Sequence, residues 1–197
     1  GHLYETTGQL DKAENQYDGI LVLRPSYAFA MAGKARIQKA HKQYDQDLAT
    51  LDKAAQIIPE LSCREQMAEI YTLQGDKEKA RKKYAEVVGM LGQDARSGHA
   101  VDLELCKLYT KTGQLDSALV YGLIEYKKRP DNIDVNHALA WVYYNQHDLK
   151  NAQKHMQVAM RTGSKDPELL QEAGAIALAL GNAAEHQKLV AAARKTN

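Results

Sequence analysis

The sequence has few of the features that point to membrane insertion, secretion or a charged partner. Its 197 residues include two cysteines, four prolines, one tryptophan and one phenylalanine. No apolar run approaches the roughly 18 to 20 residues that cross a bilayer, and residues 1–9 do not resemble a signal peptide. Lys and Arg number 26 against 25 for Asp and Glu, a formal charge of +1. A chain this close to neutral has no global field that would attract nucleic acid or an anionic membrane.

Signatures of catalysis are also missing. The sequence contains no GxSxG elbow, no GxxxxGK[ST] phosphate loop, no GxGxxG and no HExxH. Its seven histidines are scattered, and no two lie three or four residues apart as metal ligands on one helix usually do. We therefore predict that the chain is not an enzyme and needs no metal or cofactor.

The sequence does contain an internal repeat. One position recurs along the chain with spacings of 34, 33, 38, 34 and 34 residues, and it is usually alanine. The six residues at this position are Ala13, Asp47, Ala80, Ala118, Ala152 and His186. A unit of this length is one pair of helices that cannot bury its apolar face alone. Neighbouring pairs must therefore stack into a continuous core.

Glycines mark the turn inside each predicted helix pair. Such a turn needs one residue in the left-handed conformation, which glycine adopts at little cost. The glycines at this place are Gly8, Gly75, Gly113 and Gly181. Lys42 and His147 occupy it in the second and fifth units, so these two turns should be strained.

The ends of the units carry a second set of signals. Proline closes three units, at Pro25, Pro59 and Pro130, and Asp166 followed by Pro167 is typical of a helix start. The long spacing before Ala118 predicts an inserted loop, either a plain connector or an element that reaches a partner. The predicted units are 1–27 (incomplete), 28–60, 61–92, 99–132, 133–166 and 167–197, with the loop at 92–98.

In this register the chain resembles the tetratricopeptide repeat family over essentially its whole length. The motif residues include Tyr4, Gly8, Ala13, Tyr17 and Pro25, then Tyr71, Gly75, Ala80 and Tyr84, then Tyr109, Gly113, Ala118 and Pro130. The resemblance implies an all-α, right-handed superhelical solenoid of antiparallel helix pairs, whose first helices line a concave groove. It also implies a non-catalytic scaffold that binds a protein or peptide. The Lys and Asn clamp with which some members grip chaperone tails is replaced by His2, Gly33, Ser62 and Gln66, so that partner is not predicted.

The fourth unit departs from the family pattern. Gly122 and Glu125 stand where a bulky and a small residue are expected, and a strict register would bury a charge beside a hole. A slip of one residue would turn Tyr121 and Ile124 inward. We therefore expect Glu125 to face solvent.

The groove of the family suggests a binding site. The central row reads Arg36, Glu69, Lys107, Trp141 and Ala175, and the first three alternate in sign, which favours pairing between neighbouring helices. Further along, aromatic and cationic residues come together on facing helices. The candidate peptide-binding residues are Leu103, Lys107, Lys111, His137, Trp141, Tyr144 and Leu178. Such a cluster suits a segment with apolar anchors and a carboxylate, although Trp141 could equally be packed between helices.

Three expectations concern what surrounds the array. Cys63 and Cys106 lack any metal or CxxC spacing and are interpreted as reduced structural thiols, with a disulfide or metal site as the alternative. The last pair has more apolar residues than one buried face needs, among them Leu178 and Leu180, which predicts a longer chain, a partner or self-association there. The array could also be the recognition segment of a larger enzyme or transport assembly. A cytoplasmic location is favoured, but the incomplete first unit leaves a signal sequence upstream open.

Overall fold

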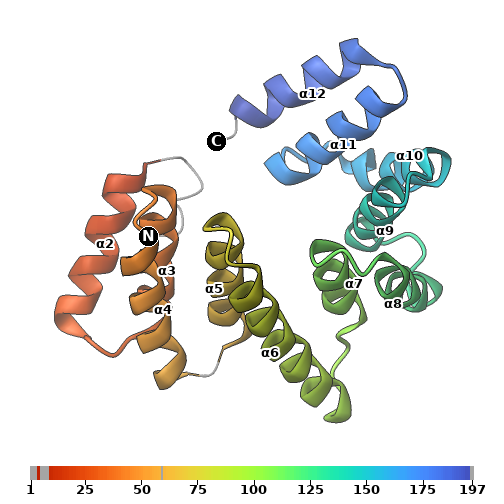
Figure 1. Ribbon diagram of the computed structural model, residues 1–197. Helices are drawn as coiled ribbons and strands as arrows, with labels where there is room; N and C mark the ends of the chain where they lie inside the picture. Colours follow the sequence, from red (N-terminus) through yellow and green to blue (C-terminus); the bar gives the residue numbers. More distant parts are fainter. Residues whose placement is uncertain (1–3, 5–8, 59, 196–197) are drawn as a thin grey trace. The chain divides into compact units, whose positions relative to one another are not determined.

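The computed structural model describes residues 4, 9–58 and 60–195, and within them the chain is all-α with no strand. Eleven α-helices follow one another through short turns (Figure 1). Their bounds are α2 Leu10–Leu23, α3 Ala28–Ala40, α4 Tyr44–Ile57, α5 Leu61–Leu73, α6 Lys77–Arg96, α7 Asp102–Lys111, α8 Leu115–Lys128, α9 Ile133–Asn145, α10 Leu149–Ala159, α11 Pro167–Ala179 and α12 Ala183–Lys195. A short 3-10 helix, Met160–Thr162, follows α10. None of the described helices is both long and apolar enough to span a bilayer.

The helices form two compact units, residues 1–90 and 91–197, and the core of each lies between consecutive helices. In the second unit, α7 packs on α8, α9 on α10, and α11 on α12. One buried cluster there joins α9, α10 and α11 through Ala140, Met156 and Leu169. Contacts of this kind confirm stacking of neighbouring pairs inside each unit, as the period predicted.

The repeating position lies in the core in five of the six pairs, whereas His186 in the last pair is half-buried. Ala13, Asp47, Ala118 and Ala152 are each fully buried, and Ala80 is 6% exposed. A small side chain is needed there because the two helices of a pair approach closely. Asp47 is larger than alanine and brings an ionisable carboxyl group into this close approach.

The turns inside the helix pairs are as predicted. Gly75, Gly113 and Gly181 have φ of 78°, 77° and 83°, and Lys42 and His147 adopt φ of 59° and 62°. Each turn closes with the same two backbone hydrogen bonds, for example His147 N–H to Tyr144 O at 3.0 Å and Asp148 N–H to Tyr143 O at 2.9 Å. Lys42 and His147 therefore adopt a conformation that disfavours side chains with a Cβ. Gly8 and Pro59 lie outside the described residues.

The prediction of a loop over 92–98 is wrong for its first five residues. Helix α6 continues to Arg96, with Val87 and Leu91 buried one turn apart on one face. Gly98, at φ 87°, ends the helix: its own N–H bonds Ala95 O, and His99 N–H bonds Asp94 O. Gly92 is an ordinary helical residue, and Gly98 is a helix cap instead of the far bracket of a loop.

The one-residue slip predicted for the fourth repeat, on α8, is also wrong. Glu125 is 2% exposed and Gly122 is buried, whereas Ile124 is 41% exposed, so α8 keeps the family register. The carboxylate is paired: Arg129 Nε lies 2.6 Å from one oxygen and Lys128 Nζ lies 3.2 Å from the other. Burial raises the pKa of Glu125, but these hydrogen bonds and charges outweigh it and hold the pKa below its usual value.

The expected hole beside Gly122 is filled by its neighbours. A Cβ at Gly122 would lie 2.7 Å from Leu139 Cδ2 and 3.0 Å from Cys106 Sγ, so the missing side chain leaves room for them. Tyr121 is half-buried and stacks on Tyr109, with ring centroids 5.6 Å apart. The glycine is therefore part of the packing between α7, α8 and α9.

Two further expectations are confirmed. Asp166 caps α11 by accepting a hydrogen bond from Leu169 N–H at 2.8 Å, with Pro167 in the first turn. Cys63 and Cys106 are both free thiols in the core. Burial raises the pKa of the Cys106 thiol to about 11, which keeps it protonated and unreactive near neutral pH.

Candidate functional site

The candidate site lies on the first helices of three successive pairs in the second unit. Helix α9 packs against α7 and also touches α11, so the three helices form one surface. Leu103, Lys107 and Lys111 come from α7, and Leu178 comes from α11. The remaining three candidates, His137, Trp141 and Tyr144, come from α9.

Trp141 and Tyr144 form the aromatic centre of this surface. Their spacing of three residues places them on one face of α9, and their rings stack with centroids 4.7 Å apart and planes 9° from parallel. Both residues are partly exposed. Tyr144 also packs on the buried cluster of α9, α10 and α11. The pair is therefore anchored to the core while part of its surface stays open to solvent.

A hydrogen-bonded histidine–carboxylate pair lies beside the aromatic centre. His137 Nε2 is 2.7 Å from Glu172 Oε2 on α11, and their side chains are 19% and 14% exposed. Burial, helped by the charge of Glu168, holds the pKa of Glu172 above its usual value, and the hydrogen bond and charge of His137 and the charge of Lys107 only partly oppose that rise. The site therefore holds a carboxylate of its own that partly offsets its cations.

Glu172 is the site residue that sequence reasoning missed. It stands 35 residues after His137, close to one repeat period, so it occupies a nearly equivalent place on the next first helix. This spacing, close to the repeat period, is the feature of the sequence that could have placed Glu172 beside His137. The central row of the groove does not include Glu172, because its residue on α11 is Ala175, three positions later.

The other candidates have different environments. Lys107 and Lys111 are exposed on α7, and Leu178 is 50% exposed on α11. Leu103 instead packs on a buried cluster that includes Cys106 and Val142 of α7 and α9. Leu103 therefore contributes mainly to the core beneath this surface.

In the first unit, Glu69 of the central row pairs with a cation on the preceding first helix. Glu69 of α5 accepts a hydrogen bond of 2.8 Å from Lys39 of α3. Arg36, the cation of the central row, donates to the carbonyl of Ala32 on its own helix at 3.4 Å. The cross-helix pair is partly exposed, so its contribution to stability is small, about 0 to 1 kcal/mol.

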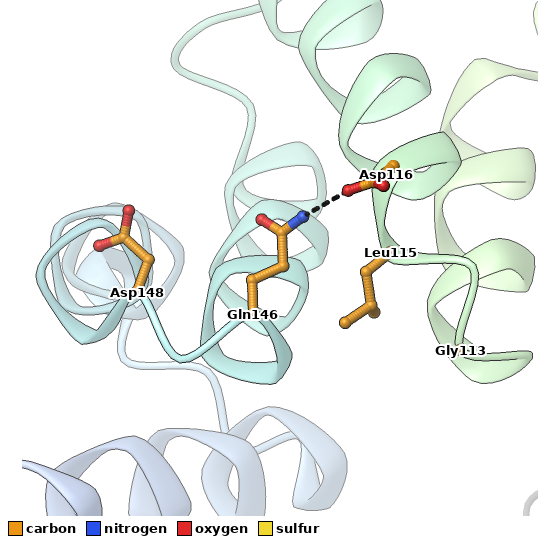
Figure 2. A pocket seen from close by; sticks show the side chains of 5 residues that line it. All are labelled: Gly113, Leu115, Asp116, Gln146 and Asp148. Carbon is orange, nitrogen blue, oxygen red and sulfur yellow. Dashed lines mark hydrogen bonds between the residues drawn. The ribbon is translucent and has the colours of Figure 1, made fainter.

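A hollow elsewhere in the second unit involves none of the seven candidates. It measures about 590 Å³ and is lined by Gly113, Leu115, Asp116, Gln146 and Asp148 (Figure 2). These residues belong to the turns and helix ends of two adjacent pairs, and Gln146 Nε2 lies 3.5 Å from Asp116 Oδ1 across the hollow. It is wide open and holds no cluster suited to chemistry. Among the described residues, no three His, Cys, Asp or Glu side chains gather closely enough to share a metal ion.

Similarity to other proteins appears in structure and not in sequence. No protein-family model and no curated protein matches the chain. A tetratricopeptide repeat protein from Parabacteroides merdae is 14% identical, with 95% of this chain and 73% of that one covered and a TM-score of 0.56. The type IV pilus biogenesis factor PilW is 17% identical, with 95% and 86% covered and a TM-score of 0.62.

The chain has a tetratricopeptide-repeat fold. Human IFIT1, in a dimer with m7Gppp-AAAA, shares that architecture at 15% identity and a TM-score of 0.65. This chain is 91% covered in that match but spans only 45% of the IFIT1 chain. Identities this low show the fold alone, and a repeat fold does not determine its ligand. The ligand must be inferred from the surface of this chain.

Proposed function

We propose that the chain is a non-catalytic scaffold that binds a peptide or protein segment on the surface formed by α7, α9 and α11. The observation that carries the proposal is the stacked, partly exposed pair Trp141 and Tyr144 at the centre of that surface. Aromatic residues in such positions are typical anchors of binding energy, because they bury much area at little entropic cost.

The charges around the pair suggest the chemistry of the segment. Lys107 and Lys111 are exposed on α7 and would attract an acidic group. The carboxylate of Glu172 weakens the field on the opposite side, where it is paired with His137. We therefore expect a segment with an apolar side chain over the aromatic pair and its acidic group toward α7.

The experiment selects peptides from a displayed library on the intact chain and measures each dissociation constant. Trp141 is the sole tryptophan, so in the wild type its fluorescence reports on this surface, and calorimetry measures the dissociation constants of wild type and variants alike. Trp141→Ala should weaken binding about 30-fold or more, since truncating a central aromatic anchor costs about 2 kcal/mol or more. Loss of the ring stack should cost only about 1 kcal/mol of stability.

Phe29→Ala is the matched control. Phe29 is an aromatic residue 52% exposed on α3 of the first unit, and its removal should leave peptide affinity unchanged. If Trp141→Ala instead lowers the melting temperature strongly while every selected peptide binds as before, Trp141 serves packing and the proposal fails.

We also propose one alternative, that the chain is the recognition segment of a longer protein whose chemistry lies elsewhere. Fusion to its neighbouring sequence would then change which selected peptides bind, whereas an autonomous scaffold would keep the same set. Self-association through the last pair, where Leu178 and Leu180 are 50% and 40% exposed, remains a prediction.

A further inference from the structure

Helix α8 presents an apolar stripe to solvent. Val120, Leu123 and Ile124 are 56%, 42% and 41% exposed, and their spacing of three and one residues places them on one face. The opposite face of α8, with Ala118 and Gly122, packs into the core. These three side chains are therefore surplus to the packing of their own helix pair.

The other repeats supply a control for this stripe. Counted from the alanine-like position of each pair, the residues equivalent to Val120, Leu123 and Ile124 are mostly polar or small. They are Asn15, Asp18 and Gly19 on α2, Ala49, Asp52 and Lys53 on α4, Lys82, Ala85 and Glu86 on α6, Lys154, Gln157 and Val158 on α10, and Lys188, Ala191 and Ala192 on α12. A face that is mostly exposed in the other described pairs is thus apolar on α8, and the packing of the pair does not require apolar residues there.

Charges of opposite sign stand at the two ends of the stripe. Asp116 lies four residues before Val120, and Lys127 lies four residues after Leu123, and both are exposed. The spacing of 116, 120, 123 and 127 is four, three and four, which is the seam of a coiled coil. Asp116 and Lys127 are about 16 Å apart along the helix, with the apolar residues midway.

We propose that this seam binds the same seam of a second copy of the chain, with the two α8 helices antiparallel. In that arrangement Asp116 of each copy faces Lys127 of the other, and Val120, Leu123 and Ile124 meet around the two-fold axis. A parallel arrangement would place like charges opposite each other. The seam is therefore complementary to itself in one orientation only.

Two features set the strength of the contact. Asp116 already faces Gln146, but at 3.5 Å this hydrogen bond is at the limit of the useful range and leaves the carboxylate available. One helix face of this size falls at the small end of protein interfaces. The dimer should therefore be weak and should form in the range of tens to hundreds of micromolar.

Sedimentation equilibrium of the intact chain from about 10 µM to 1 mM tests the proposal. The wild type should show a monomer–dimer equilibrium, and Leu123→Glu should weaken it at least about tenfold, because the seam would bury two unpaired carboxylates. Lys154→Glu, at the position of α10 equivalent to Val120, should leave the equilibrium unchanged. Circular dichroism of both variants confirms that the fold is retained.

Charge exchange tests the orientation. Asp116→Lys and Lys127→Asp should each weaken self-association about tenfold, because each places like charges together at both ends of the seam. An equimolar mixture of the two variants should associate again, since every end contact becomes an opposite-charge pair. The double variant, with both charges exchanged in one chain, should also recover.

Three results would overturn the proposal. The first is a wild-type chain that stays monomeric up to 1 mM. The second is a dimer that persists in Leu123→Glu and disappears in Leu180→Glu, which would place the interface on the last pair. The third is a mixture of the two charge variants that associates no better than either variant alone, because the end pairs would then not face each other.

Discussion

Replacing Asp47 by alanine should stabilise the protein, and the gain should depend on pH. Asp47 is fully buried on α4 at the position where four other repeats carry alanine. Neither carboxylate oxygen has a hydrogen-bond partner. Burial raises its pKa from 3.8 to about 7, with the charge of Glu69 adding to the rise and that of Lys39 opposing it.

The sign and magnitude follow from proton linkage. In the unfolded chain the carboxyl ionises near its ordinary pKa of 3.8, whereas in the folded chain it holds its proton up to about pH 7. The free energy of unfolding therefore falls as pH rises between these values and is flat above the upper one. At about 1.36 kcal/mol per pKa unit, the full loss is about 4 kcal/mol. The cavity left by the removed carboxyl offsets part of the gain, so we expect Asp47→Ala to stabilise by roughly 2 to 4 kcal/mol at pH 8.

Urea unfolding at pH 5 to 8 measures the difference between wild type and variant, which cancels the titration of all other groups. The difference should grow from pH 5 to about pH 7 and then level off. Hydrogen exchange of α3, α4 and α5 localises the effect, since repeat proteins open locally. Asp47→Asn keeps the size but cannot ionise, so its stability should vary with pH as that of the alanine variant does. A difference that stays constant from pH 5 to 8, or an alanine variant less stable than wild type at pH 8, would refute the reasoning.

Two further stability predictions use the same assay. Lys42→Gly and His147→Gly should each stabilise the protein by about 1 kcal/mol, because both positions have positive φ. The control Lys154→Gly, inside α10, should destabilise it by about as much. Equal effects at all three sites would contradict this reasoning. Glu125→Ala should cost about 1 kcal/mol, because it removes charge-assisted hydrogen bonds to a buried carboxylate while its half-exposed partners stay solvated and Lys128 keeps its ion pair with Asp102. Because the pKa of Glu125 is lowered, its contribution is present above the ordinary carboxyl pKa and is lost in acid, so the cost of Glu125→Ala should vanish at low pH.

The fold could be predicted because residues that break its repeating pattern of turns and core positions lower the stability of the protein. The turn between paired helices needs a left-handed residue, and the period identified that residue even where lysine or histidine occupies it, at Lys42 and His147. The core positions were equally clear, since a large side chain at Ala118 or Ala152 could not fit between the helices. Backbone sterics and close packing repeat from unit to unit, so six weak signals in phase reinforce each other.

The errors arose where one residue was judged without its neighbours. Glu125 was expected in solvent because an unpaired buried carboxylate is costly, but Lys128 and Arg129, three and four residues on, pair with it from the same helix. The pair Gly92 and Gly98 predicts a loop, but only Gly98 has the positive φ of a helix cap. In both cases the deciding partner was local and its spacing was visible in the sequence.

Surface function is harder to predict than fold because the outward positions of a repeat are not constrained by packing. The sequence could place Trp141 and Tyr144 on one face of a helix, but it could not tell how far a neighbouring helix would cover them, and it missed Glu172 on α11. The apolar seam on α8 shows how a repeat protein reduces this difficulty. Because the equivalent residues on α4 and α10 experience the same fold, a position that departs from them departs for a reason other than folding. The repeat thus supplies its own reference, against which a surface selected for binding can be distinguished from one that is merely solvated.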